Sequence, residues 1–271
     1  MLSFFAWHDG RLAPRPLAIS PWAPGTLSGT GLCGLLAREL ETHCPAAFVP
    51  ARLTVDLYQP VAATEFALSS TVVRRGSRIA VAAAVLLQDG APRVRASAVF
   101  LTTGDQPPGT VWSPGEELPM PPSGTMSPEG SPPLFRSGDG EWSSDFAAHQ
   151  NAERKIAWQS LPPLVAGEPI TPFQRAAILG DSTNHVCHWG SAGAGYINAD
   201  VTLTLARLPV GHEQGLRAES TIAAAGVSIG TATLYDRAGP VGTTVVTALS
   251  NARRQIDFAA TSAAELAGTS D

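Results

Sequence analysis

Alternation of apolar and polar residues marks most of the strands that we expect in this chain. The segments 52–57 (RLTVDL) and 200–205 (DVTLTL) place an apolar side chain at every second position, which is the period of a strand with one buried face. On this basis we predict strands over 49–58, 65–74, 78–87 and 93–101 in the first half, and over 196–205, 216–224, 228–235 and 241–249 in the second.

Two segments follow the period of a helix instead. Leucines recur three and four residues apart within 30–41, and Ser28 or Thr30 can cap the start of this helix. A second helix is expected to begin at Thr171-Pro172, because proline suits the first turn of a helix. It runs through 174–179 toward Asp181.

The segment 105–140 interrupts both patterns. It holds nine of the 23 prolines of the chain, and proline serves neither a helix interior nor a central strand. We therefore predict an N-terminal repeat over 1–104, a Pro/Gly-rich linker over 105–140, a C-terminal repeat over 141–260 and a tail over 261–271.

Turn residues recur at an offset of about 150 residues on either side of this linker. Gly76 corresponds to Gly226, and the turn at Asp89-Gly90 corresponds to the turn over 236–239. Such regularity indicates an internal duplication, in which each half is one helix followed by a meander of long strands. The predicted fold class is α+β.

Composition and charge argue against some classes of protein. Hydrophobic residues make up 44% of the 271 residues and the formal net charge is −5, which predicts a globular protein and argues against a nucleic-acid partner. The apolar start over 1–7 is too short for a signal peptide, and the run over 79–87 is too short to cross a membrane. We expect a cytoplasmic protein with no membrane partner. Its three cysteines, Cys33, Cys44 and Cys187, are expected to be reduced thiols.

Several short motifs, in this order and spacing, resemble the acyl-CoA thioesterase II (TesB-type) family, in its actinobacterial thioesterase-like branch. They are PWAPG at 21–25, SGTG at 28–31 and LLAR at 35–38 in the first half, and GDSTN at 180–184, INADVT at 197–202 and RLPVG at 207–211 in the second. The resemblance covers nearly the whole chain outside the linker. It implies a double hotdog fold, in which each half is a long helix wrapped by an antiparallel sheet.

The same resemblance implies hydrolysis of acyl thioesters of coenzyme A or of an acyl carrier protein. The catalytic aspartate of the family corresponds to Asp181, and the polar residue on the following strand corresponds to Asn198. A glutamine is expected on the last strand, where this chain has Val246, or Thr247 after a shift of one residue. Thioester hydrolysis needs a carboxylate that positions water and donors for the developing oxyanion.

Further residues are expected to contact the substrate. The backbone of Gly29, Thr30 and Gly31 can approach a carbonyl or phosphate group at the start of the first helix. Asn184 and His185 follow Asp181 in a polar run, and His185 lies one helical turn after it. We expect neither a metal ion nor a cofactor, because no zinc, P-loop or dinucleotide-binding motif is found in the sequence.

The absent glutamine keeps two alternatives open. One is a lyase, isomerase or cyclase of lipid or polyketide metabolism that acts on a polyketide-type intermediate without hydrolysis. The other is a non-catalytic protein that binds acyl ligands. Exposed sheet edges also leave assembly into a homo-oligomer open.

Overall fold

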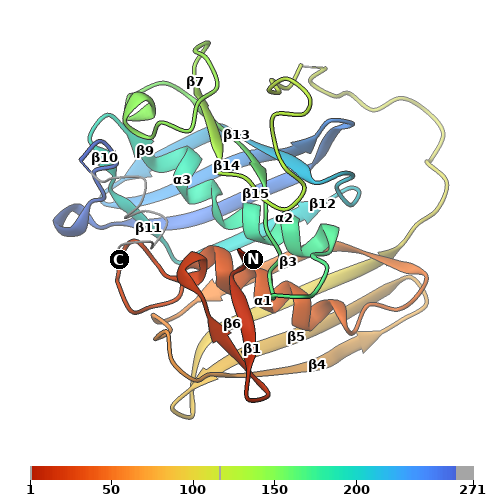
Figure 1. The fold of residues 1–271 in the computed structure, drawn as a ribbon. Coiled ribbons are helices and arrows are strands. Elements are labelled where there is room, and N and C mark those ends of the chain that lie inside the picture. The colour runs from red at the N-terminus through yellow and green to blue at the C-terminus, as the bar shows by residue number, and fades with distance from the viewer. Residues whose placement is uncertain (1, 116, 261–271) are drawn as a thin grey trace.

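The computed structural model describes residues 2–115 and 117–260. Its helices α1 (Gly29–Glu41) and α2 (Pro172–Asp181) lie side by side in the middle of the molecule (Figure 1). An 11-stranded sheet packs around this helix pair. First-half strands lie on one side of the pair in Figure 1 and second-half strands on the other, as the resemblance implies.

The two halves contribute matching parts of the sheet. The strand order is β4-β5-β6-β3 in the first half and β12-β15-β14-β13 in the second, and the halves join where β3 pairs with β12. First-half strands are β3 (Phe48–Leu57), β4 (Ala67–Arg75), β5 (Ile79–Gln88) and β6 (Ala91–Thr102); second-half strands are β11 (Tyr196–Asn198), β12 (Asp200–Leu205), β13 (Glu213–Ala224), β14 (Val227–Asp236) and β15 (Gly239–Ser250).

Matching turns support the predicted duplication. Asp89 and Gly90 connect β5 to β6 with φ values of 54° and 75°, and the corresponding turn between β14 and β15 has Gly239 with a φ value of 108°. Glycine adopts such left-handed backbone without steric cost. All eight predicted strand ranges overlap observed strands, although the range 196–205 is divided into β11 and β12 by a bend at Ala199.

The helix pair is antiparallel and closely packed. Midway along it, a Cβ on Gly34 would lie 2.7 Å from a methyl group of Leu164 and 2.8 Å from the Ile178 side chain, so glycine permits the approach of α2. At one end, Glu41 of α1 accepts hydrogen bonds from the Thr171 hydroxyl (2.8 Å) and the Gln174 amide (3.3 Å) at the start of α2. Gly29 meets Asp181 at the other end.

Several elements extend this plan beyond the two repeats. They are β1 (Phe5–His8), β2 (Arg11–Pro14), η1 (Pro16–Ala18), β7 (Leu134–Ser137), η2 (Ala147–His149), β8 (Lys155–Ser160), α3 (Thr183–His188), β9 (Trp189–Gly190), β10 (Gly193–Ala194) and η3 (Ala252–Arg254). Strands β8 and β7 continue the second-half sheet beyond β13.

The Pro/Gly-rich segment packs partly onto the second half. Within 105–140, Leu118, Met126 and Phe135 are buried, and the Tyr235 hydroxyl donates a hydrogen bond to the Pro119 carbonyl. The expected tail over 261–271 lies outside the described residues. In the described part of the chain, no helix has the length and apolar character needed to span a membrane.

Candidate active site

Asp181 ends α2 and faces the first turn of α1. A Cβ placed on Gly29 would lie 2.4 Å and 2.6 Å from the two carboxylate oxygens of Asp181, so any larger residue would force the carboxylate or the helix turn to move. A carboxylate at a helix C-terminus opposes the dipole of its own helix. Here the positive N-terminal end of α1 lies directly against it, which compensates for that placement.

The start of α1 offers two free backbone donors beside this carboxylate. Ser28 caps the helix by accepting a hydrogen bond from the Gly31 N–H at 3.2 Å, and its carbonyl accepts from the Leu32 N–H. The N–H groups of Gly29 and Thr30 precede any intrahelical acceptor. Neither finds an acceptor among residues 2–115 and 117–260, so both are available to a bound carbonyl oxygen.

A bulge directs Asn198 toward Asp181. Asn198 pairs with Ala248 of β15, and Thr202 pairs with Val245 of β15. The chain therefore advances four residues from Asn198 to Thr202 while β15 advances only three, which leaves one extra residue on the Asn198 side. This irregularity at Ala199 re-aims the side chains on either side of it. The Asn198 amide consequently donates a hydrogen bond of 2.9 Å to an Asp181 carboxylate oxygen.

The environment of Asp181 favours its protonated form. Burial raises the pKa of this carboxyl from 3.8 to about 6, and the hydrogen bond from Asn198 opposes the increase. A carboxylate with a pKa near 6 is ionised at neutral pH and is basic enough to accept a proton from water.

The expected glutamine position carries an apolar side chain that cannot hydrogen-bond to water or to this carboxylate. Val246 is fully buried, and its cross-strand neighbour Gly230 lies against Cys187 of α3, so Val246 packs beneath α3. Thr247 alternates with Val246 and points to the face of the sheet turned away from the helices, beside the exposed Ile229. Its backbone N–H donates to the Asp200 carboxylate at 3.0 Å.

The two residues expected after Asp181 have other partners. His185 lies in an aromatic cluster, with its ring 4.8 Å from those of Phe258 and Trp189 and 5.6 Å from that of Phe135. Burial lowers the pKa of His185 to about 4, so the imidazole is neutral. Asn184 donates to the Tyr196 carbonyl at 3.0 Å instead of facing Asp181.

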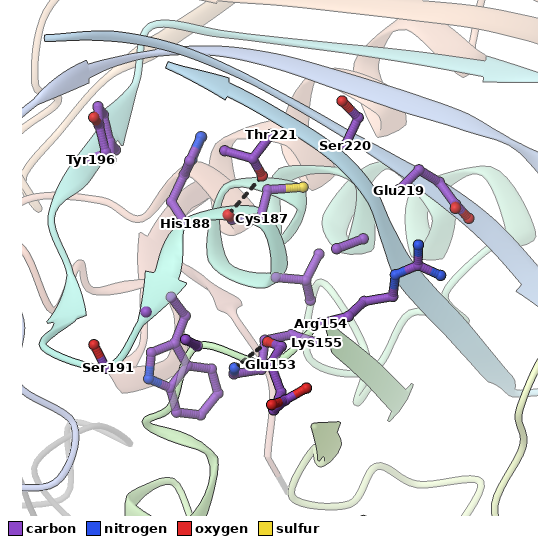
Figure 2. A pocket seen from close by; sticks show the side chains of 15 residues that line it. Glu153, Arg154, Lys155, Cys187, His188, Ser191, Tyr196, Glu219, Ser220 and Thr221 are labelled. Atoms are coloured by element: carbon purple, nitrogen blue, oxygen red, sulfur yellow. Dashed lines mark hydrogen bonds between the residues drawn. The ribbon is translucent and has the colours of Figure 1, made fainter. Parts of the chain in front are cut away.

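A separate cavity of about 490 Å³ is lined in part by Cys187 and His188 of α3 (Figure 2). Figure 2 shows His188 and Tyr196 on one side of it and Arg154 and Lys155 on the other. Neither Asp181 nor Gly29 lines it. The Lys155 ammonium is already bound by the Asn151 side chain and by two carbonyls, and burial lowers its pKa to about 8.

The described residues contain no group of three or more His, Cys, Asp or Glu side chains arranged to hold a metal ion. The sequence identified Gly29, Asp181 and Asn198 separately, and the structure brings them together. The sequence gave no indication that Ser228, His188 and Asn184 are linked by hydrogen bonds.

Two family models match most of the chain. The acyl-CoA thioesterase N-terminal domain matches residues 18–101, and the acyl-CoA thioesterase C-terminal domain matches residues 116–249. The chain belongs to the acyl-CoA thioesterase family. At the level of this family it is an acyl thioester hydrolase. None of the curated proteins matches the chain in sequence.

Solved structures of low sequence identity share its fold. The TesB protein of Mycobacterium avium subsp. paratuberculosis is 14% identical, with a TM-score of 0.62 over 83% of this chain and 87% of that one. The acyl-CoA thioesterase II TesB2 of Mycobacterium marinum is 13% identical, with a TM-score of 0.60 over 82% and 88%. A conserved hot dog fold protein of Alicyclobacillus acidocaldarius is 15% identical, with a TM-score of 0.62 over 90% and 94%. The double hotdog prediction is confirmed.

Proposed function

We propose that this thioesterase hydrolyses acyl thioesters of coenzyme A or of an acyl carrier protein at the contact between Asp181 and the first turn of α1. The observation that supports this most directly is the juxtaposition of a carboxylate with free backbone donors. The Asp181 carboxylate oxygens lie against Gly29. The backbone N–H groups of Gly29 and Thr30 have no hydrogen-bond acceptor in the described part of the chain.

In this mechanism the thioester oxygen accepts hydrogen bonds from the N–H groups of Gly29 and Thr30. Asp181 holds a water molecule and takes its proton as the water oxygen attacks the carbonyl carbon. The negative charge that develops on the oxygen is stabilised by the donors and by the α1 dipole. The intermediate then releases the thiolate as the C–S bond breaks, and the thiolate takes the proton from Asp181. Asn198 keeps the carboxylate oriented throughout.

The pH dependence of turnover follows from the ionisation of Asp181. Because the pKa of Asp181 is about 6, the ionised carboxylate, which is the active form, accumulates as the pH rises through that value. We expect kcat/KM to increase about tenfold per pH unit well below pH 6 and to level off above it. Initial rates at constant ionic strength measure this limb, and a flat profile between pH 4.5 and about 7 would contradict the assignment of Asp181 as the base.

The experiment that tests the activity is a panel of acyl-CoAs of increasing chain length, together with acylated carrier protein, assayed by release of free thiol. Hydrolysis yields one thiol and one free acid for each thioester consumed. Release of thiol that requires the folded protein supports the proposal. Absence of release from every substrate would overturn hydrolysis.

A second candidate, non-hydrolytic chemistry on an acyl intermediate, is favoured by one observation. The position expected to carry glutamine is the fully buried Val246, which offers no group to hold water. Mass analysis of the same reactions distinguishes the two: hydrolysis adds water across the thioester, whereas a lyase, isomerase or cyclase step leaves the thioester bond intact.

Val246→Gln is expected to destabilise the protein. The new amide would be buried beneath α3, at a cost of about 1–3 kcal/mol in the free energy of unfolding. Urea unfolding measures the loss, with Val246→Leu as the apolar control. A gain in kcat/KM would show that position 246 reaches the substrate.

Three further expectations from the sequence stay predictions. They are a cytoplasmic location, a role in lipid or polyketide metabolism, and assembly into a homo-oligomer. Exposed apolar side chains on the outer face of the second-half sheet, at Ile222, Ile229 and Leu249, give the last of these a surface to test by light scattering.

A further inference from the structure

A chain of buried hydrogen bonds leads from β14 to the strand that carries Asn198. The Ser228 hydroxyl lies 2.8 Å from Nε2 of His188, whose Nδ1 lies 2.7 Å from the Asn184 amide oxygen. The Asn184 amide nitrogen then donates to the Tyr196 carbonyl at 3.0 Å. All three side chains are at least nine-tenths buried, at 0%, 7% and 6% exposure for Ser228, His188 and Asn184.

The direction of each hydrogen bond in this chain is fixed. Because the Asn184 nitrogen donates to Tyr196, its oxygen can only accept, so Nδ1 of His188 must carry the proton. Burial lowers the pKa of His188 to about 4, so the ring is neutral and Nε2 can accept a hydrogen bond. The Ser228 hydroxyl lies 2.8 Å from Nε2 and 3.3 Å from the Ile222 carbonyl, and its one proton goes to the nearer acceptor, Nε2.

Asn198 lies two residues after the carbonyl at which this path ends. Strand β11 has three residues, Tyr196–Asn198, and pairs on one side with β15. The Asn184 amide supplies a second attachment, from α3. In a strand, Tyr196 and Asn198 share a face, and the tilted contact of the Tyr196 ring with His188, 5.0 Å between centroids, places that face against α3.

We propose that Ser228, His188 and Asn184 are positioning residues that hold the Asn198 amide against Asp181. The proposal rests on the function proposed above, in that it concerns the same carboxylate. When the Nδ1–H donor is lost, the buried Asn184 oxygen has no partner, and the amide can satisfy itself only by leaving Tyr196. Strand β11 then keeps its pairing to β15 alone, and the hydrogen bond from Asn198 to Asp181 loosens.

The ionisation of Asp181 reports this loosening directly. The Asn198 hydrogen bond lowers the pKa of Asp181, so its loss raises that pKa. Other titratable groups nearby do not obscure the effect. The Cys33 thiol of α1 and His185 of α3 are both held neutral by burial, and the Asp200 carboxylate accepts from the Thr247 N–H on β15.

The test compares His188→Leu, which removes the donor, with His188→Asn, whose amide nitrogen takes the place of Nδ1. Carbon-13 NMR of aspartate-labelled protein gives the titration midpoint of Asp181. The Asp181 signal is identified as the one that is missing from the spectrum of Asp181→Asn. For His188→Leu we expect the midpoint to rise by about one pH unit. For His188→Asn we expect it to stay within about 0.3 unit of the wild type.

Ser160→Ala is the matched control. Ser160 is also a buried serine of the second-half sheet, at 1% exposure, but its hydroxyl donates to the Ser127 carbonyl and has no link to His188. Ser160→Ala should leave the midpoint unchanged. Ser228→Ala no longer holds the His188 ring in its Nδ1–H tautomer, so it should raise the midpoint in the same direction as His188→Leu. The milder Ser228→Ala decides the question if His188→Leu does not fold.

An unchanged midpoint in folded His188→Leu and Ser228→Ala would overturn the proposal, as would an equal shift in His188→Asn. The acid limb of kcat/KM on the best acyl-CoA should move with the NMR midpoint. If no acyl-CoA is hydrolysed, the proposed function fails, while the NMR titration still decides whether the hydrogen-bond chain positions Asn198.

Discussion

Asp181→Asn is expected to lower kcat/KM for the best acyl-CoA by about 10²- to 10⁴-fold, because the amide cannot take a proton from water. The asparagine side chain keeps the shape of the aspartate, and its amide oxygen can still accept the hydrogen bond from Asn198. Substrate binding should therefore persist. Free-thiol release gives the rate, and isothermal titration with a non-hydrolysable acyl-CoA analogue gives the affinity.

The same variant is expected to be more stable than the wild type at neutral pH. The folded-state pKa of about 6 lies above the ordinary value of 3.8, so folding disfavours the ionised carboxylate. Wild-type stability is full below about pH 4 and decreases as the pH rises through 6, by about 3 kcal/mol, whereas the asparagine variant keeps it. Denaturant unfolding at pH 4 and pH 7 measures the difference.

Asp56→Asn is the control for the activity measurement. Asp56 is a half-buried aspartate of β3 that pairs across the sheet with Asp200, on the face turned away from the helices. Its replacement should leave turnover within about twofold of the wild type, as expected for a site outside the reaction centre. Retained hydrolysis in Asp181→Asn would remove Asp181 from the mechanism.

Gly29→Ala is expected to reduce kcat/KM by about 10²-fold, since a displacement of roughly 1 Å at a reacting group has this effect. The added methyl group would meet both carboxylate oxygens of Asp181 at less than van der Waals distance. Either the carboxylate or the first turn of α1 must move, and both belong to the proposed site. Thiol-release kinetics measure the loss, and thermal unfolding establishes that the variant is folded.

Gly180→Ala provides a control one residue from Asp181. A Cβ at Gly180 would make only ordinary contacts, the nearest at 3.7 Å with the Thr244 side chain. Alanine is also the better helix former, so this variant should be active and at least as stable as the wild type. Equal losses in the two variants would show that any methyl group near α2 disturbs the enzyme, and that the Gly29 contact is not special.

Local patterns in the sequence predict the repeated part of this fold well. Alternation over 49–58 matches β3 at Phe48–Leu57, because a strand with one buried face must alternate whatever its neighbours are. The proline after Thr171 marks the observed start of α2, where Thr171 accepts from the Gln174 N–H as a helix cap. These features depend on residues a few positions apart.

The site itself depends on contacts that no local pattern contains. Gly29 and Asp181 are far apart in sequence and meet because α1 and α2 pack antiparallel. The bulge at Ala199, which directs Asn198, arises from pairing with β15. Alternation alone could separate the faces of Val246 and Thr247, but only the observed register reveals that one packs beneath α3 and the other points outward.

The two ends of the helix pair are related by the duplication but are not chemically equivalent. At the end opposite Asp181, the Glu41 carboxylate is already occupied by the Thr171 hydroxyl and the Gln174 amide, which also cap α2. A symmetric pair of identical chains would have to keep both ends alike, whereas fusion allows each end to diverge. The Glu41 end can thus hold the two halves together permanently. We expect each chain to bind one acyl thioester, at the Asp181 end, rather than two.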